Sequence, residues 1–219
     1  MKKTNTIFDK IYILSFVYNS KKRKTISNYL TKKLGIKNFE FIYGIDANIS
    51  NIHDVKCYDV NIMEKPYIEW HNRDKTNSYH LHDISCSLGH LSIYQVAYSE
   101  GYEKILIIED DSIFIDNIPL ILEYFNNVPE DANIVYYGYK HNYGFEGEHY
   151  NHLYNKLTNY INVAGTNCYG IFNNETLRKI IDYNEKNKIL SVSDQYLPLV
   201  TDNQYIAKTN LLQDENFEC

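Results

Sequence analysis

Short apolar runs recur along this chain, and between them apolar residues return every three or four positions. Runs rich in Ile, Val, Tyr and Phe favour buried strands, because β-branched and aromatic side chains pack well on a pleated sheet. Such runs occupy residues 10–18, 39–46, 104–109, 133–139, 162–172 and 203–209. We therefore expect a strand at each of these places, with 104–109 as the most apolar and central one.

Helical periodicity marks four segments between these runs: residues 20–34, a segment that begins near 83 or 85 and ends before 101, residues 117–129 and residues 174–186. Ser20 is a suitable cap for the first helix, and Gly35 is a suitable end. The polar stretch 140–157 has the composition of a loop. Strands that alternate with helices predict one α/β domain, residues 1–219, with a mostly parallel central sheet flanked by helices.

Composition narrows the class of protein. The formal charge of −6 argues against a nucleic-acid partner, which usually requires a basic face. No apolar run reaches the ~20 residues of a transmembrane helix, and Asp9 and Lys10 interrupt the lysine-led start, which argues against a signal peptide. The four scattered cysteines form no paired motif. We therefore expect reduced thiols in a cytoplasmic protein, with peripheral attachment to a membrane left open.

Three consecutive carboxylates, Glu109, Asp110 and Asp111, follow four aliphatic residues of the central strand. Ligands of open α/β sheets bind at the carboxyl ends of strands, and carboxylates beside a dry core need a neutralising partner. Capping of a turn or helix is one explanation. A hard divalent cation is the other, because Mg²⁺ and Mn²⁺ take oxygen ligands and retain positions for nucleotide phosphates. Repulsion among three acids favours the metal.

The residues Lys21 to Lys24 are all basic and occupy the first turn of the first predicted helix. Each cation there costs ~0.3–1 kcal/mol against the helix dipole, and a bound diphosphate would offset that cost. A solvated face explains most of these lysines equally well. Arg23 is the member that we expect to contact a phosphate or a base.

Several stretches of the chain, in the order in which they occur, resemble the motifs of glycosyltransferase family 25. They are IYILSF, KKRKTISNYLTKKLGIKNFEFIYGIDA, ISCSLGHLSIYQVAYSEGYEKILIIEDDSIFI, CYGIFNNETLRKII and SVSDQYLPLV, within residues 10–213. That family includes bacterial lipooligosaccharide galactosyltransferases, and the collagen galactosyltransferases are related to it. The resemblance implies a GT-A-like, Rossmann-type fold, a UDP-galactose or UDP-glucose donor, Mn²⁺ or Mg²⁺, and inverting transfer to a hydroxyl of a glycan or glycoconjugate.

Site residues follow from the resemblance position by position. Asp110 and Asp111 match the DxD-like element, so Asp111 would bind the metal and Asp110 the donor ribose or the metal shell. Ser15 and Arg23 would lie near the uracil and the diphosphate. Asp46 ends the second predicted strand, where nucleotide-binding folds often place a base or ribose contact.

The helix before the central strand departs from the family pattern. The family commonly has glycine before its cysteine and serine before its histidine, and this chain has Ser85 and Gly89 there. His90 is kept, and we place it on the donor side, with a purely structural role as the alternative. The departures bear on substrate preference more than on reaction class.

Inverting transfer also needs a carboxylate that accepts the proton of the acceptor hydroxyl. Asp194 matches a late acidic position of the family, and a helix N-cap is its alternative role. Glu146 and Glu148 are weaker candidates. Two other functions remain open: a sugar nucleotidyltransferase, although the chain has no glycine-rich phosphate loop near the first strand, and a non-catalytic sugar-binding protein on the same fold.

Overall fold

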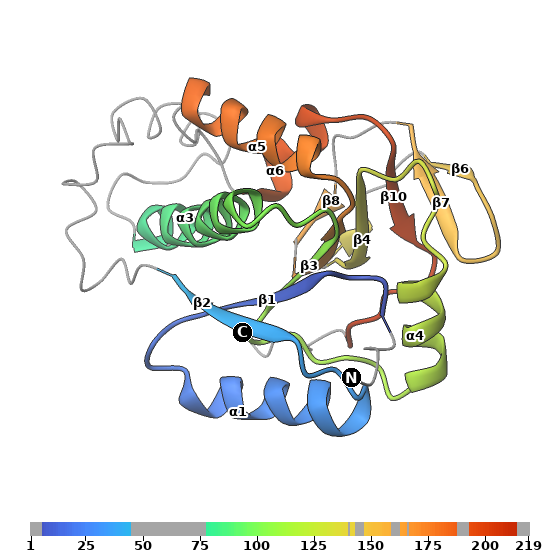
Figure 1. The fold of residues 1–219 in the computed structure, drawn as a ribbon, viewed down its shortest axis with the longest axis horizontal. Coiled ribbons are helices and arrows are strands. Elements are labelled where there is room, and N and C mark those ends of the chain that lie inside the picture. The colour runs from blue at the N-terminus through green and yellow to red at the C-terminus, as the bar shows by residue number, and fades with distance from the viewer. Residues whose placement is uncertain are drawn as a thin grey trace.

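The computed structural model describes residues 6–44, 78–139, 141–142, 147–158, 163–165, 167–187 and 193–213. Within these residues an eight-stranded sheet has the order β2-β1-β3-β9-β4-β10-β7-β6 (Figure 1). Its strands are β1 (Lys10–Ser15), β2 (Phe39–Tyr43), β3 (Ile105–Glu109), β4 (Ile134–Gly138), β6 (Gly147–His149), β7 (Tyr154–Leu157), β9 (Cys168–Ile171) and β10 (Gln204–Ala207). A separate short pair joins β5 (His141–Asn142) to β8 (Val163–Ala164).

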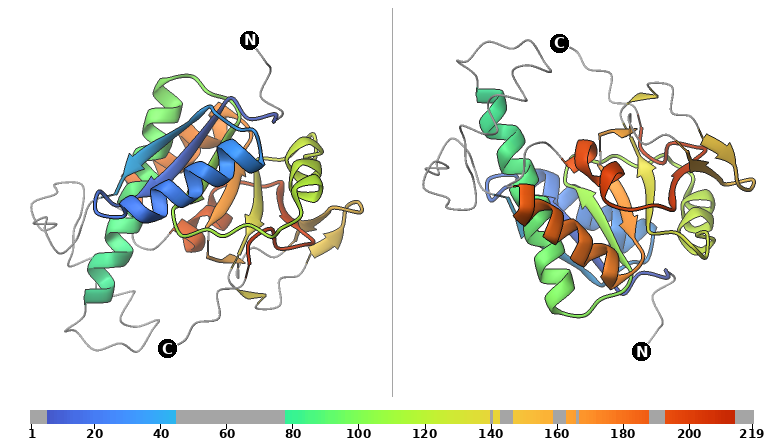
Figure 2. Two further views of the ribbon diagram at one scale, coloured as in Figure 1. Left: turned by 90° about the horizontal axis from the view of Figure 1, so that it is seen from below. Right: turned by 90° about the horizontal axis from the view of Figure 1, so that it is seen from above.

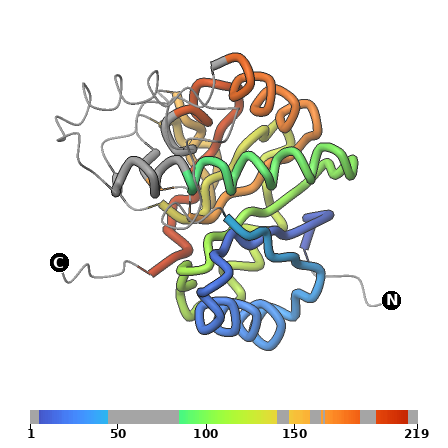
Figure 3. Tube along the Cα trace, turned by 90° about the vertical axis from the view of Figure 1, so that its left-hand side faces the viewer, coloured from blue at the N-terminus to red at the C-terminus, as the bar shows by residue number. Residues whose placement is uncertain are grey.

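Helices cover both faces of the sheet. One face carries α1 (Ser20–Asn28), which continues as a π-helical turn (Tyr29–Lys33), and α4 (Ile118–Asn126). The other carries α3 (Ser78–Ser99), α5 (Asn174–Asn187) and α6 (Ser193–Val200). Figure 2 shows α1 in front of the sheet from below and α3 with α5 in front from above, and Figure 3 shows the same layers from the side.

The apolar run of β3 is buried on both sides. Leu106 and Ile108 belong to the core under α1, whereas Ile105 and Ile107 belong to the core under α3. All four side chains are fully buried. Full burial of one such side chain is worth about 1.5–3 kcal/mol, so β3 is a rigid centre on which the residues that follow it are mounted.

The α/β class is confirmed, but the expectation of a mostly parallel sheet is wrong. Among the described strands, β1 pairs in parallel with β2 and β3, and β4 with β10, while the other four neighbouring pairs are antiparallel. Strand β9 runs opposite to both β3 and β4. A parallel return needs a crossover, usually a helix, and the described residues between β4 and β9 form short strands instead of a helix.

The stretch 140–157 is not simply a loop, because it contributes strands to the sheet edge. Strands β6 and β7 form an antiparallel hairpin, with Glu148 opposite Lys156, and β7 pairs with β10. All three residues of β6 are exposed. A fully exposed strand lacks the alternation of apolar and polar residues that marks a half-buried strand. The polar sequence of β6 is therefore indistinguishable from that of a loop.

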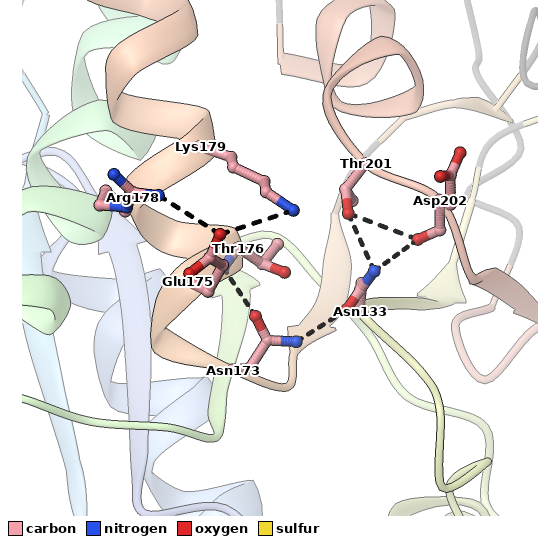
Figure 4. A network of polar contacts seen from close by, with 8 residues as sticks. All are labelled: Asn133, Asn173, Glu175, Thr176, Arg178, Lys179, Thr201 and Asp202. Atoms are coloured by element: carbon pink, nitrogen blue, oxygen red, sulfur yellow. Dashed lines mark hydrogen bonds and ion pairs between the residues drawn. The ribbon is translucent and has the colours of Figure 1, made fainter.

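Asn133 connects three segments at the amino end of β4, away from the end that carries the acidic residues. Its side-chain nitrogen donates to Thr201 Oγ1 at 2.9 Å and to the Asp202 carbonyl at 2.8 Å. Its side-chain oxygen accepts from Asn173 Nδ2 at 2.7 Å, and Asn173 Oδ1 caps α5 by accepting from the Thr176 amide (Figure 4). This network holds the start of α5 and the start of β10 to β4.

No helix in the described ranges has both the length and the apolar character needed to cross a membrane.

Candidate functional site

The carboxyl ends of β1 and β3 lie side by side. Leu14 is the parallel partner of Glu109, and the Asp110 amide donates to the Leu14 carbonyl at 3.0 Å. The last residue of β1, Ser15, therefore faces the first residue after β3, Asp110. This is the edge at which the sequence predicts a ligand site.

The pleat of β3 sends the three carboxylates in different directions. Successive side chains of a strand point to opposite faces, and Glu109 follows the Ile105–Ile107 side toward α3. Asp110 points to the other side, where it contacts the segment between β1 and α1. The repulsion that the sequence suggests is thus reduced by geometry, because Glu109 and Asp110 have separate sets of partners.

Asp110 is held by two side chains of the β1–α1 segment. Ser15 Oγ donates to Asp110 Oδ2 at 2.5 Å, and Asn19 Nδ2 donates to the same oxygen at 3.0 Å. Ser20 is not the cap of α1, because Asn19 occupies the N-cap position and makes no side-chain cap. The side-chain amide of Asn19 donates to Asp110 instead of capping the helix.

Asp111 differs from Asp110 in having an oxygen without a partner. Its Oδ1 atom is buried and makes no hydrogen bond in the described part of the chain. Its Oδ2 atom lies 3.7 Å from Lys22 Nζ, an ion pair in which both side chains are partly exposed. A buried carboxylate oxygen that lacks a partner costs free energy, and a hard cation is a partner that would satisfy it.

Arg23 lies at the same end of the sheet but its guanidinium is already occupied. It donates to the Phe16 carbonyl, to the Val17 carbonyl at 2.8 Å and to Ser15 Oγ at 3.4 Å. It also lies over the Tyr43 ring, 5.3 Å from the centroid. Arg23 therefore shapes the segment that carries Ser15 and Asn19.

On the other face, Glu109 meets helix α3. His90 Nε2 lies 3.2 Å from Glu109 Oε1, and Cys86 Sγ lies 3.8 Å from the same oxygen. The second oxygen, Oε2, accepts from Asn167 Nδ2 at 3.0 Å. His90 is fully buried, and its Nδ1 lies 2.8 Å from the Tyr169 hydroxyl. Burial raises the pKa of Tyr169 well above its ordinary value, so this hydroxyl stays protonated.

A cavity of about 300 Å³ opens between the Asp110–Asp111 side of the strand end and the Cys86–Glu109 side. Its lining includes the end of β1, the following segment and the residues after β3: Leu14, Ser15, Phe16, Tyr18, Asn19, Lys22, Gly44, Ser85, Cys86, Glu109, Asp110 and Asp111. The Phe16 and Tyr18 rings stack at 5.5 Å between centroids. Acidic, cationic and aromatic groups thus share one hollow, a combination that suits a charged ligand with a ring.

The structure brings together several of the predicted site residues. Ser15, Asp110 and Asp111 line the cavity, and Arg23 supports it through Ser15. His90 stands behind Glu109 and is absent from the cavity lining.

Other predicted residues are not brought into the site. Asp46 and Glu146 lie outside the described residues, and Glu148 is exposed in β6. Asp194 is the second residue of α6, whose Tyr196 and Leu197 pack in the core under α3. The Asp194 side chain lies outside the described part of the structure, so its role stays a prediction.

Sequence reasoning missed Asn19, Lys22 and Cys86 as members of the site. Lys22 was part of a basic run that a solvated face could explain. Cys86 and His90 are four residues apart on a helix, a spacing that places two side chains on one face. That spacing was the available signal for Cys86, whereas the contact of Asn19 with Asp110 depends on the tertiary fold.

A comparison with protein families identifies the family of the chain. The family model described as glycosyltransferase family 25 (LPS biosynthesis protein) matches residues 8–197, which is most of the chain and includes every cavity-lining residue named above. A comparison with individual curated proteins gave no match. The family match agrees with the resemblance expected from the ordered motifs. The chain therefore belongs to glycosyltransferase family 25 and is a glycosyltransferase, an enzyme that acts on a sugar donor and an acceptor.

Proposed function

We propose that this glycosyltransferase takes galactose or glucose from a UDP-sugar, with Mn²⁺ or Mg²⁺, and transfers it with inversion to a hydroxyl of a glycan or glycoconjugate. The fold would then be a GT-A-like variant in which β9 runs antiparallel. The observation that carries the proposal is the buried, unpartnered Asp111 Oδ1 beside the cavity at the ends of β1 and β3.

The residues present fit a divalent ion. Asp111 would supply the first ligand, and Asp110 would bind either the ion or the donor ribose. Oxygen ligands of this kind suit Mg²⁺ and Mn²⁺. When bound, the ion would stabilise the negative charge that grows on the departing diphosphate.

The chain's own residues prepare the donor side of the cavity. Ser15 and Asn19 fix Asp110 Oδ2 in one orientation, so little reorganisation is needed when the donor binds. Lys22, beside Asp111, is placed to attract a diphosphate. The stacked rings of Phe16 and Tyr18 offer an aromatic surface for a base or a sugar.

The acceptor hydroxyl would attack the anomeric carbon on the side opposite the diphosphate, and a carboxylate would take its proton. We assign the role of proton acceptor to Asp194, at the start of α6. The assignment comes from its place in the family's motif order. Family membership disfavours the nucleotidyltransferase alternative, because a glycosyltransferase transfers the sugar and not the nucleotidyl group.

Titration calorimetry with UDP-galactose and UDP-glucose, with and without Mn²⁺, tests the donor and the metal together. We expect Mn²⁺-dependent binding, which Asp111→Asn weakens by at least about tenfold, or ~1.4 kcal/mol. Asp202→Asn is a matched control at the opposite end of the sheet, where the side chain is exposed. Equal UDP affinity in Asp111→Asn and the control would refute the metal assignment.

The catalytic base has a separate test. Asp194→Asn should bind donor and Mn²⁺ as the unaltered protein does, yet lose transfer measured by mass spectrometry of a glycan acceptor. An Asp194→Asn variant with normal turnover would eliminate this residue as the base and leave the donor site untouched.

A further inference from the structure

We propose a second metal site in this protein, formed by Cys86, His90 and Glu109, that takes an ion of the zinc class such as Zn²⁺ or Co²⁺. The site is distinct from the acidic pair after β3 and does not depend on the proposed donor chemistry. Its three ligand atoms lie within 4.8 Å of one another. They come from one turn of α3 and from the last residue of β3.

The two distances to Glu109 Oε1 match tetrahedral coordination. With Zn–N and Zn–O bonds of about 2.0–2.1 Å and a Zn–S bond of about 2.3 Å, tetrahedral ligands are separated by about 3.3 Å for N and O and about 3.6 Å for S and O. The structure has 3.2 Å between His90 Nε2 and Glu109 Oε1, and 3.8 Å between Cys86 Sγ and Glu109 Oε1. The third pair, Cys86 Sγ and His90 Nε2, lies within 4.8 Å, compared with about 3.6 Å for tetrahedral ligands. One ion would therefore bind all three atoms once the Cys86 side chain and the imidazole move to the tetrahedral separation.

The groups around the three ligands are those that orient metal ligands. Histidine ligands usually give their second ring nitrogen to a hydrogen-bond partner, and ligating carboxylates are themselves hydrogen bonded. Here Tyr169 lies 2.8 Å from His90 Nδ1, and Asn167 Nδ2 holds Glu109 Oε2 at 3.0 Å. These contacts leave His90 Nε2 and Glu109 Oε1 facing each other and Cys86.

The tyrosine pair completes this arrangement. Metal binding requires Nδ1–H of His90 to donate to Tyr169, so the Tyr169 hydroxyl must donate elsewhere. The Tyr94 hydroxyl, 2.5 Å away, would accept this hydrogen bond from Tyr169. Nε2 then presents its lone pair toward Glu109 and Cys86.

Ligand chemistry and charge select the ion. A thiolate and an imidazole favour Zn²⁺ over Mg²⁺ or Mn²⁺, which prefer oxygen. Binding releases the Cys86 thiol proton to solvent, so the thiolate, the Glu109 carboxylate and a divalent ion together carry no net charge. Neutrality suits a place where His90 is fully buried.

Entry and an open coordination position are provided by the cavity. Both Cys86 and Glu109 line it, so an ion reaches the site from the solvent side. Three protein ligands leave a fourth position for water or another oxygen. The ion would join the middle of α3 to the carboxyl end of β3, beside the pocket.

The experiment uses Co²⁺ as a spectroscopic probe in a Cys57→Ser/Cys219→Ser background, which keeps Cys86 and Cys168. We expect one equivalent of Co²⁺ with thiolate-to-cobalt charge transfer, displaced by Zn²⁺. Cys86→Ser should abolish the band. Cys168→Ala is the matched control and should retain it, because Cys168 is fully buried in β9 and burial raises the pKa of its thiol. A band that survives Cys86→Ser, or no band before that change, overturns the site.

A second measurement needs no change in the site. Zn²⁺ at 100 times its dissociation constant leaves about one site in a hundred free, so alkylation of Cys86 should slow by about 100-fold. Mass spectrometry of the modified peptide reads this protection, and an unchanged rate overturns the proposal.

Asp111→Asn separates this site from the donor metal. It should retain the cobalt band while losing Mn²⁺-dependent UDP binding, so either proposal can fail without the other. Loss of the band in Asp111→Asn would mean that Asp111 is needed to hold the cobalt, and it would overturn a separate site at Cys86, His90 and Glu109.

Discussion

Replacing Ser15 by alanine should measure how firmly β1 holds Asp110. Ser15 is almost fully buried, and its hydroxyl donates to Asp110 Oδ2 at 2.5 Å. A hydrogen bond to a charged group contributes about 1.5–3 kcal/mol, and Asn19 remains as the other partner of that oxygen. We expect Ser15→Ala to lower the free energy of unfolding by about 1.5–3 kcal/mol. For a protein of this size that is a fall in Tm of about 3–12 °C.

A double-mutant cycle isolates the contact from other effects of the substitution. Urea denaturation followed by circular dichroism gives the free energy of unfolding of Ser15→Ala, Asp110→Ala and the double variant. We expect a coupling energy of at least about 1 kcal/mol, since the two side chains touch directly. Ser99→Ala, at an exposed serine near the far end of α3, should change stability by no more than about 0.5 kcal/mol. A coupling energy near zero would refute the reasoning.

Three further changes test other parts of the structure. Asn133→Ala removes three hydrogen bonds and should cost about 3 kcal/mol in urea denaturation; an unchanged midpoint would contradict its linking role. Burial raises the pKa of Tyr137 and Tyr154 above the ordinary tyrosine value of 10.0, so the stability that these protonated hydroxyls contribute is present below pH 10 and is lost above it. Each should lower the unfolding free energy by about 1.4 kcal/mol per pH unit above 10, and Tyr137→Phe should make the measured slope shallower by that amount. Lys22→Gln should tighten nucleotide-free Mn²⁺ binding about two- to fivefold, the range of an exposed ion pair, since Lys22 competes for Asp111; calorimetry showing weaker binding would contradict this.

Local pattern predicted the elements whose faces are buried. The π-helical continuation of α1 carries the helix to residue 33, close to the predicted end at 34. Asn117 caps α4 by accepting from the Leu120 amide, with Pro119 in the first turn, as the capping rules imply. Such features depend on neighbours within a few residues, which the sequence displays directly.

Strand direction and the polar edge could not be predicted in that way. The direction of β9 depends on how the chain returns from β4, over about thirty residues that give no helical signal. Strand β6 has three exposed residues and so no apolar residue that faces a core. The pairing partners of such strands are decided by the tertiary fold, so no local sequence pattern reveals them.

The acidic triplet shows why a strand-end motif underdetermines its own chemistry. Its position after a buried strand was enough to predict a ligand site, and Asp110 and Asp111 do line a cavity. The pleat separates Glu109 from them, however, and gives it a cysteine and a histidine as neighbours in place of lysine and serine. Adjacent carboxylates in sequence therefore meet different partner chemistry on the two faces of one sheet. Ligand preference follows those partners, so the proposed hard-metal site at Asp111 and the proposed zinc-class site at Cys86, His90 and Glu109 would be separable properties of one strand end.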